Sequence, residues 1–263
     1  MSFDTEGHFS GELDLYQIAI LPQYKEYFDF IFRLNLLAQE HKFKYSCNNL
    51  DRIKIISNCL FLKILNVFQS CIILLKHLLP FEASALSRTL CEPLYLIKIL
   101  LDDESEFWRE YLKQSAYLTK KTINVAKQNP HEIFDLVRDY ATIEVIEDLD
   151  KKLQSFNPNQ FKVENLAIKA GLKNHYDTMF RVTSNEVHTP PYVIFRYVEF
   201  NENNEAIAFN FGPATKEYDR IIIAISDVLI KSLVFMDNLH KIEHHKDFDA
   251  IVIRWKTLNQ QTE

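Results

Sequence analysis

The sequence predicts a mostly α-helical protein, a multi-helix bundle with one small β-hairpin insertion. Apolar residues recur at three- and four-residue spacing through most of the chain, and only one segment, residues 192–211, changes to the spacing of strands. With 263 residues, 47% of them hydrophobic, the chain can bury a substantial core. We expect a flexible tail over residues 1–12 and a single helical domain over residues 13–263, with its core in residues 50–240.

Prolines divide the N-terminal third into helices. Pro22 separates a short helix from a longer one within residues 13–40. The next helix, over residues 51–79, is apolar nearly all round, so we expect it to be central. Pro80 ends it, and a second buried helix follows over residues 81–101, where Pro93 should cause a kink. Candidate N-caps for the central helix are Ser46, Asn48 and Asn49.

The later helices are marked by amphipathic spacing and by caps. Residues 104–128 are amphipathic, and Asn129-Pro130 should open a further helix that runs to about residue 155 with an acid-rich outer face. A short helix over residues 163–170 is closed by Gly171. The hairpin strands are residues 192–200 and 205–211. Another apolar helix covers residues 214–240, and residues 246–259 form either a final helix or a short strand.

The best chemical signal lies in residues 174–191, where Arg181 and His188 are seven residues apart. In an α-helix this spacing puts both side chains on one face, about 10.5 Å apart along the axis. Pro190 and Pro191 stop the helix, so His188 should lie in its last turn, where unpaired carbonyls favour an imidazolium. The alternative reading is structural, with Arg181 paired to a buried acid and His188 capping carbonyls.

Arg88 and Glu92 form a second signal, at i,i+4 spacing on an otherwise apolar helix. Buried charges must be paired, so we expect an ion pair that faces the helix of Arg181 and contacts Tyr176 or His188. The structural reading treats the pair as part of the core. The functional reading makes Glu92 the group that orients His188.

Composition excludes several classes of protein. The four glycines form neither a P-loop nor a dinucleotide-binding fingerprint. With a net charge of −6, the chain lacks the overall basic character of a typical nucleic-acid binder, although residues 160–196 carry five cations against three acids.

The cysteines and the lack of targeting segments indicate the compartment. The four cysteines form no C-x-x-C pair and are expected to be reduced and buried; they are Cys47, Cys59, Cys71 and Cys91. With no secretory signal and no uncharged run longer than twelve residues, we expect a cytoplasmic protein without a membrane segment.

No metal or cofactor is expected. His240, Glu243, His244 and His245 place two histidines at i,i+4 spacing, but no third ligand is evident and the run lies among charged residues. A solvated helix end is the preferred interpretation.

The Arg-Thr-x-x-Glu of residues 88–92, with Tyr176, Ser184 and His188 ahead of the proline-bounded hairpin, resembles a bacterial all-helical family known only as a domain of unknown function. The resemblance covers about residues 50–240 and implies a fold rather than an activity. More distantly, Arg181-x6-His188 is similar to the motif of the HEPN superfamily, an arginine and a histidine separated by four to six residues. That similarity implies a helical bundle, often dimeric, and metal-independent RNA cleavage in toxin–antitoxin or phage-defence systems.

Two functions therefore stay open. In the first, a homodimeric endoribonuclease leaves 2′,3′-cyclic phosphate ends, Arg181 and His188 act on the phosphodiester, and Ser184 and Asn185 orient the phosphate. RNA and an antitoxin or defence-system protein would be its partners. In the second, a catalytically silent helical module binds a protein partner or a small ligand near Arg88 and Glu92.

Overall fold

The structure is a computed structural model, and it confirms a mostly helical fold with one two-stranded antiparallel sheet. It describes residues 2–46, 51–102, 106–188, 190–210, 212–214, 217–243 and 246–261. The side chains of Val182, Asn185, Glu186, Lys246 and Gln261 are outside this description.

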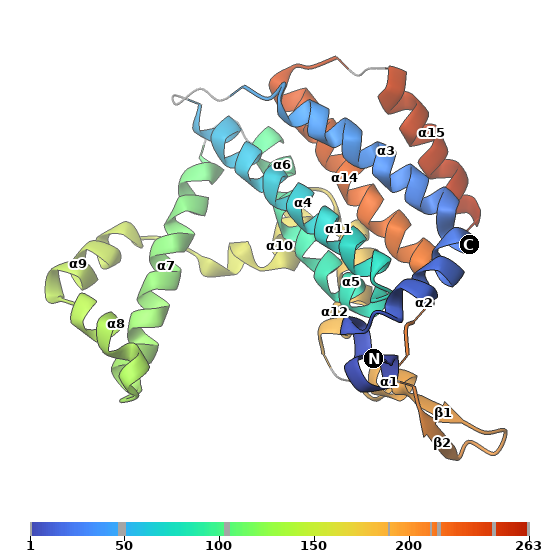
Figure 1. The fold of residues 1–263 in the computed structure, drawn as a ribbon. Coiled ribbons are helices and arrows are strands. Elements are labelled where there is room, and N and C mark those ends of the chain that lie inside the picture. Colours follow the sequence, from blue (N-terminus) through green and yellow to red (C-terminus); the bar gives the residue numbers. More distant parts are fainter. Residues whose placement is uncertain are drawn as a thin grey trace.

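The body of the molecule is a bundle of long helices (Figure 1). Helix α4 contacts α5, α6 and α14, while α14 also contacts α3 and α15. Because α4 and α14 each touch several neighbours, they bury apolar side chains on more than one face, as the apolar composition of their sequences requires. The helices of the body are α3 (Lys25–Lys42), α4 (Arg52–Lys76), α5 (Pro80–Ser87), α6 (Cys91–Asp102), α10 (Val163–Lys169), α14 (Tyr218–His240) and α15 (Lys246–Gln261).

The start of the chain is helical where a loose tail is expected. Helix α1 (Phe3–Glu6) and a 3₁₀ turn, Gly7–Phe9, precede α2 (Leu13–Ile20). Phe3 is buried and packs edge-to-face on Tyr16, with ring centroids 5.6 Å apart. The predicted division at Pro22 is present, as a 3₁₀ turn over Leu21–Tyr24 between α2 and α3.

The cap of α4 differs from the prediction. Asp51 is its N-cap, and the Asp51 carboxylate accepts a hydrogen bond from the Lys54 backbone N–H at 3.0 Å. Asn48 and Asn49 lie outside the described residues, while the Ser46 hydroxyl lies 3.4 Å from His240 Nδ1. By length and composition α4 could cross a membrane, which is weak evidence because buried core helices meet the same criterion.

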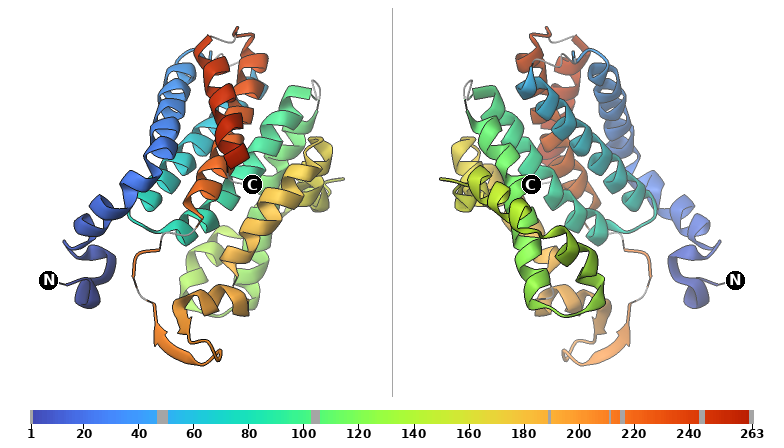
Figure 2. Two further views of the ribbon diagram at one scale, coloured as in Figure 1. Left: turned by 90° about the vertical axis from the view of Figure 1, so that its right-hand side faces the viewer. Right: turned by 90° about the vertical axis from the view of Figure 1, so that its left-hand side faces the viewer.

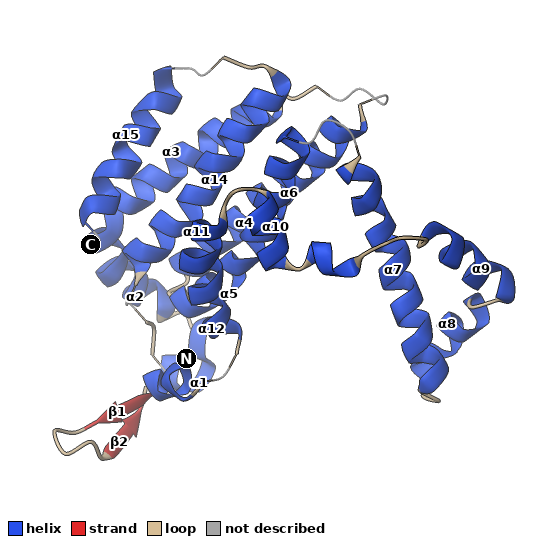
Figure 3. Cartoon of the chain, turned by 180° about the vertical axis from the view of Figure 1, so that it is seen from behind, coloured by secondary structure: helices blue, strands red, loops and turns tan. Residues whose placement is uncertain are grey.

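Helices α7 (Phe107–Gln128), α8 (Asp135–Tyr140) and α9 (Ile143–Lys152) form an arm that projects from the body (Figures 1 and 3). The single helix expected after Asn129-Pro130 is divided at Thr142, whose hydroxyl caps α9 by accepting from the Val145 N–H. Several apolar side chains of the arm are exposed, including Ile133 and Ile143, each 73% exposed.

The remaining elements follow the arm. Helix α11 (Lys173–His175) continues through a π-helical segment, Tyr176–Phe180, into α12 (Arg181–Val187). Helix α13 (Pro191–Ile194) and a 3₁₀ turn, Phe195–Tyr197, occupy residues predicted as strand, so the hairpin is shorter than expected. Its strands are β1 (Val198–Phe200) and β2 (Ala206–Phe209), with Val198 opposite Phe209. The hairpin extends from the end of the bundle near the N-terminus (Figure 2).

Candidate functional site

Arg181 and His188 lie at opposite ends of α12, and both are exposed. The Arg181 side chain is 60% exposed, with its Nε 3.4 Å from an Asp177 carboxylate oxygen. Its guanidinium carbon lies 5.7 Å from the centroid of the Tyr176 ring. A solvent-exposed ion pair of this kind contributes about 0–1 kcal/mol, so it leaves the guanidinium available to another anion.

His188 lies one residue beyond its predicted place in the last helical turn. Helix α12 ends at Val187, and His188 has an extended backbone, with φ −99° and ψ 170°. The two prolines that follow lack the N–H groups that would continue the helix. Since His188 has left the helix, the seven-residue spacing no longer fixes its side chain on the face of Arg181.

The supporting residues of α12 and the preceding turn are occupied by local contacts. The Ser184 hydroxyl donates to the Phe180 carbonyl at 2.5 Å, which takes up its only proton. Tyr176 stacks on Phe180, with ring centroids 5.0 Å apart. The predicted role of the Asn185 side chain falls outside the described residues.

Arg88 and Glu92 are not paired with each other, which corrects the predicted ion pair. Residues Arg88–Leu90 form a 3₁₀ turn between α5 and α6, so the bend precedes Pro93, which falls in the first turn of α6. A 3₁₀ turn has three residues per turn, and the i,i+4 relation of an α-helix is therefore lost. The Arg88 guanidinium instead lies over the Phe180 ring, 4.6 Å from its centroid, and so does face the segment of Arg181.

A histidine that the sequence reasoning missed, His175, is at the centre of a buried polar chain. Its side chain is 8% exposed. The Tyr95 hydroxyl lies 2.9 Å from His175 Nδ1, and His175 Nε2 is 3.5 Å from a carboxylate oxygen of Asp227. Asp227 in turn forms an ion pair with Lys231 one turn along α14. The chain joins α6, α11 and α14.

Burial controls the protonation of this chain. Desolvation lowers the pKa of His175 to about 4, against the opposing attraction of Asp227, so the ring is neutral near pH 7. Burial likewise raises the pKa of the neighbouring Cys91 thiol to about 12. The only sequence signal for the site was the position of His175 inside the stretch 174–191. The partners Tyr95 and Asp227 come from helices that are distant in the sequence.

His175 also lines a cavity of about 770 Å³ between the α10–α11 turn, the π-helical segment, α14 and α15. Its wall includes three cationic side chains, one carboxylate, an indole and several apolar groups. Its lining includes Lys173, Arg220, Ile223, Asp227, Lys231 and Trp255.

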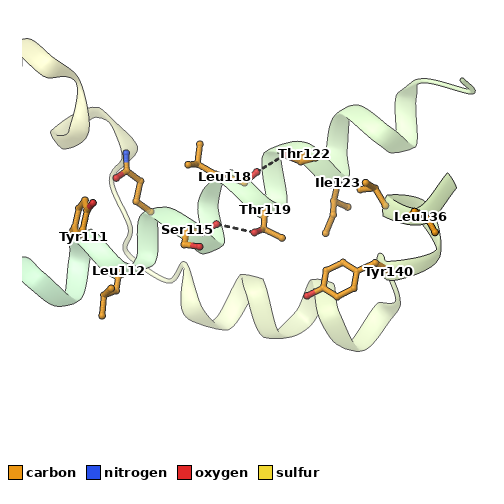
Figure 4. A pocket seen from close by; sticks show the side chains of 11 residues that line it. Tyr111, Leu112, Ser115, Leu118, Thr119, Thr122, Ile123, Leu136 and Tyr140 are labelled. Carbon is orange, nitrogen blue, oxygen red and sulfur yellow. Dashed lines mark hydrogen bonds between the residues drawn. The ribbon is translucent and has the colours of Figure 1, made fainter. Parts of the chain in front are cut away.

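A second hollow, of about 760 Å³, lies on the arm between α7 and α8 (Figure 4). Ile123 and Tyr140 point into the space between these helices. The wall is apolar apart from a few hydroxyl groups and one amide. The hydroxyl groups of Thr119 and Thr122 donate to backbone carbonyls one turn earlier in α7. Leu136 on this wall is 84% exposed, so the arm presents unpartnered apolar surface.

Two further predicted features can be placed. His240 Nε2 lies 2.9 Å from the Asn58 side-chain oxygen, whereas His244 and His245 are outside the described residues. Among the residues that are described, no group of three metal-ligating side chains is found. Cys71 and Cys91 are buried as predicted, but Cys59 is exposed, and Cys47 is not described.

The model of one protein family, "Family of unknown function (DUF5677)", matches residues 54–206, a little over half of the chain. The chain belongs to this family. No curated protein and no solved structure gives a match.

The DUF5677 match runs from α4 to the start of β2, so it contains every site residue that the sequence predicted. It also contains Tyr95 and His175. Asp227, Lys231 and Trp255 lie beyond it, in α14 and α15. The His175 cavity is therefore built partly from the DUF5677 region and partly from the C-terminal helices that cover it.

Proposed function

We propose that this DUF5677 protein is a metal-independent endoribonuclease of toxin or phage-defence type, in which Arg181 binds the scissile phosphate and His188 transfers protons. The observation that carries the proposal is the exposure of both side chains at the two ends of α12. Arg181 is held by a weak surface ion pair with Asp177 and by contact with the Tyr176 ring. Its planar guanidinium suits two phosphate oxygens.

The proposed reaction is an intramolecular transesterification. The ribose 2′-oxygen attacks the adjacent phosphorus, the bond from phosphorus to the 5′-oxygen breaks, and the products are a 2′,3′-cyclic phosphate and a 5′-hydroxyl. One base must accept the 2′-hydroxyl proton and one acid must protonate the leaving oxygen. Each chain supplies one His188, so a homodimer that brings two α12 segments to one RNA strand would supply an imidazole for each role.

The test compares variants on single-stranded RNA in the presence of a chelator. His188→Ala should abolish cleavage while leaving the melting temperature nearly unchanged, because the side chain is exposed. His77→Ala removes another exposed histidine and is the matched control, so it should retain activity. Equal activity of His188→Ala and wild type would contradict the proposal. Loss of growth toxicity on expression should accompany loss of cleavage.

A second function, protein binding by the arm, is favoured by its exposed apolar wall. We propose a second copy of this chain as the occupant, because the arm carries charges of both signs. Lys121 and Lys127 are exposed on α7, and Glu144 and Glu147 are exposed on α9. Two arms related by a two-fold axis would place the lysines of one against the acids of the other.

Sedimentation analysis tests this arm-to-arm dimer. Leu136→Ser should weaken self-association, whereas Leu36→Ser, which changes a leucine 62% exposed on α3, should not. A wild-type chain that stays monomeric at all concentrations would exclude the dimer. Equal effects of the two substitutions would exclude the arm as its interface.

A further inference from the structure

We propose that the cavity around His175 is a binding site for a small organic anion, a molecule with an aromatic or apolar body and one phosphate or carboxylate head. Its volume of about 770 Å³ lies within the range of about 300–1,000 Å³ that is usual for small-molecule sites. Neither Arg181 nor His188 lines this cavity. This site is therefore separate from the residues of the proposed ribonuclease activity.

The charge of the wall favours an anion. The wall carries one carboxylate, that of Asp227, and three cationic side chains, those of Lys173, Arg220 and Lys231. Lys231 already pairs with Asp227, and Lys173 pairs with Asp177 at 2.6 Å, outside the wall. Arg220 is exposed and forms no ion pair within the part of the chain that the structure describes. Its guanidinium is thus the group best placed to take the head of a ligand.

The apolar part of the wall suits a ring. Trp255 comes from α15, and its indole N–H donates to the Ile223 carbonyl at 3.3 Å, which ties the ring to α14. A ligand body would be held between this indole and the aliphatic side chains of the wall, such as Ile223. Aromatic surface with a few convergent polar groups is typical of sites for small molecules.

His175 supplies an independent indication of a ligand. When the Tyr95 hydroxyl donates to Nδ1, the neutral ring carries its proton on Nε2. Nε2 is buried and makes no hydrogen bond within the described chain, and the Asp227 oxygen 3.5 Å away is an electrostatic neighbour only. Buried donors rarely stay unpaired. This unpartnered donor belongs to a ring that itself lines the cavity.

The chain contains only two tryptophans, so Trp108→Phe leaves Trp255 as a single fluorescent reporter on the cavity wall. This variant is titrated with phenyl phosphate, benzoate and benzylamine, which share a ring and differ in the head group. We expect saturable changes in fluorescence with phenyl phosphate or benzoate, and none with benzylamine. Whether one or both anions bind identifies the preferred head.

Variants in the same background locate the binding. Arg220→Gln should weaken it by about tenfold or more, the loss expected for a hydrogen bond to a charged group. His175→Asn should weaken it by about fivefold, and Arg33→Gln, on exposed α3 surface, should leave it unchanged. No saturable change with either anion up to ~10 mM, or binding of benzylamine as tight as that of the anions, would overturn the proposal. Equal losses in Arg220→Gln and Arg33→Gln would also overturn it.

Discussion

His175 should make folding stability fall as the pH is lowered from neutral. Burial lowers its pKa from the usual 6.5 to about 4 in the folded chain, whereas the unfolded chain keeps the usual value. Between pH 6.5 and pH 4, His175 therefore binds a proton in the unfolded state but not in the folded state. The stabilising effect of the neutral ring is complete above pH 6.5 and is lost progressively down to about pH 4.

The size of the effect follows from the two pKa values. Each pKa unit corresponds to 1.36 kcal/mol, so the full loss below pH 4 is about 3 kcal/mol. About 2 kcal/mol of this should already be lost between pH 7 and pH 5. Native proteins are stable by only about 5–15 kcal/mol, so the loss is large enough to measure.

Urea unfolding at pH 7, 6 and 5 measures this loss in the wild type and in His175→Asn. An asparagine carbonyl can still accept the Tyr95 hydroxyl but does not titrate in this range. Other groups that titrate contribute equally to both proteins, so the difference between the two pH profiles isolates His175. The same slope in both proteins would show that His175 does not cause the loss of stability.

Three further changes test the packing, each measured as the free energy of unfolding in urea. Asp237→Ala should cost about 3–5 kcal/mol, because its fully buried carboxylate accepts a hydrogen bond from the Tyr45 hydroxyl at 3.1 Å and lies 3.0 Å from His41 Nδ1. A loss below about 1 kcal/mol would contradict this prediction. Tyr218→Phe should cost about 0.5–1.5 kcal/mol, because it removes the buried bond from the Tyr218 hydroxyl to the Leu75 carbonyl at 2.8 Å, while that carbonyl keeps the Leu78 N–H at 3.0 Å. No loss would mean that the hydroxyl bond is absent. Gly171→Ala should cost about 1–2 kcal/mol, because a residue with a side chain is strained at the Gly171 φ of +68°, even though an added Cβ would meet no atom within 4 Å. A stabilised variant would show that Gly171 does not have this left-handed conformation.

Much of the fold could be predicted from the sequence because local signals agree with the tertiary arrangement. Pro22 and Gly171 mark real boundaries, and the apolar composition of residues 51–79 correctly indicated a central helix. The division of the helix after Asn129 was missed. Thr142 there acts as a cap, which apolar spacing does not reveal.

The site was harder to predict because its geometry depends on contacts between distant segments. The expected Arg88–Glu92 pair assumed an uninterrupted α-helix, and a 3₁₀ turn removed that relation. His175 has no informative neighbour in sequence, since Tyr95 and Asp227 are brought to it only by packing of α6 and α14. Helix α12 also ends at Val187, so the helical spacing from Arg181 could not predict the direction of the His188 side chain.

The chemistry of the ends that the protein leaves on RNA decides whether Arg181 and His188 carry out the proposed reaction. Purified wild-type protein is incubated with a single-stranded RNA in a chelator, and the 3′ ends of the fragments are identified by mass spectrometry. The proposed roles of Arg181 and His188 predict 2′,3′-cyclic phosphate ends that His188→Ala does not produce. Fragments with 3′-hydroxyl ends, or intact RNA at all protein concentrations, would exclude this reaction.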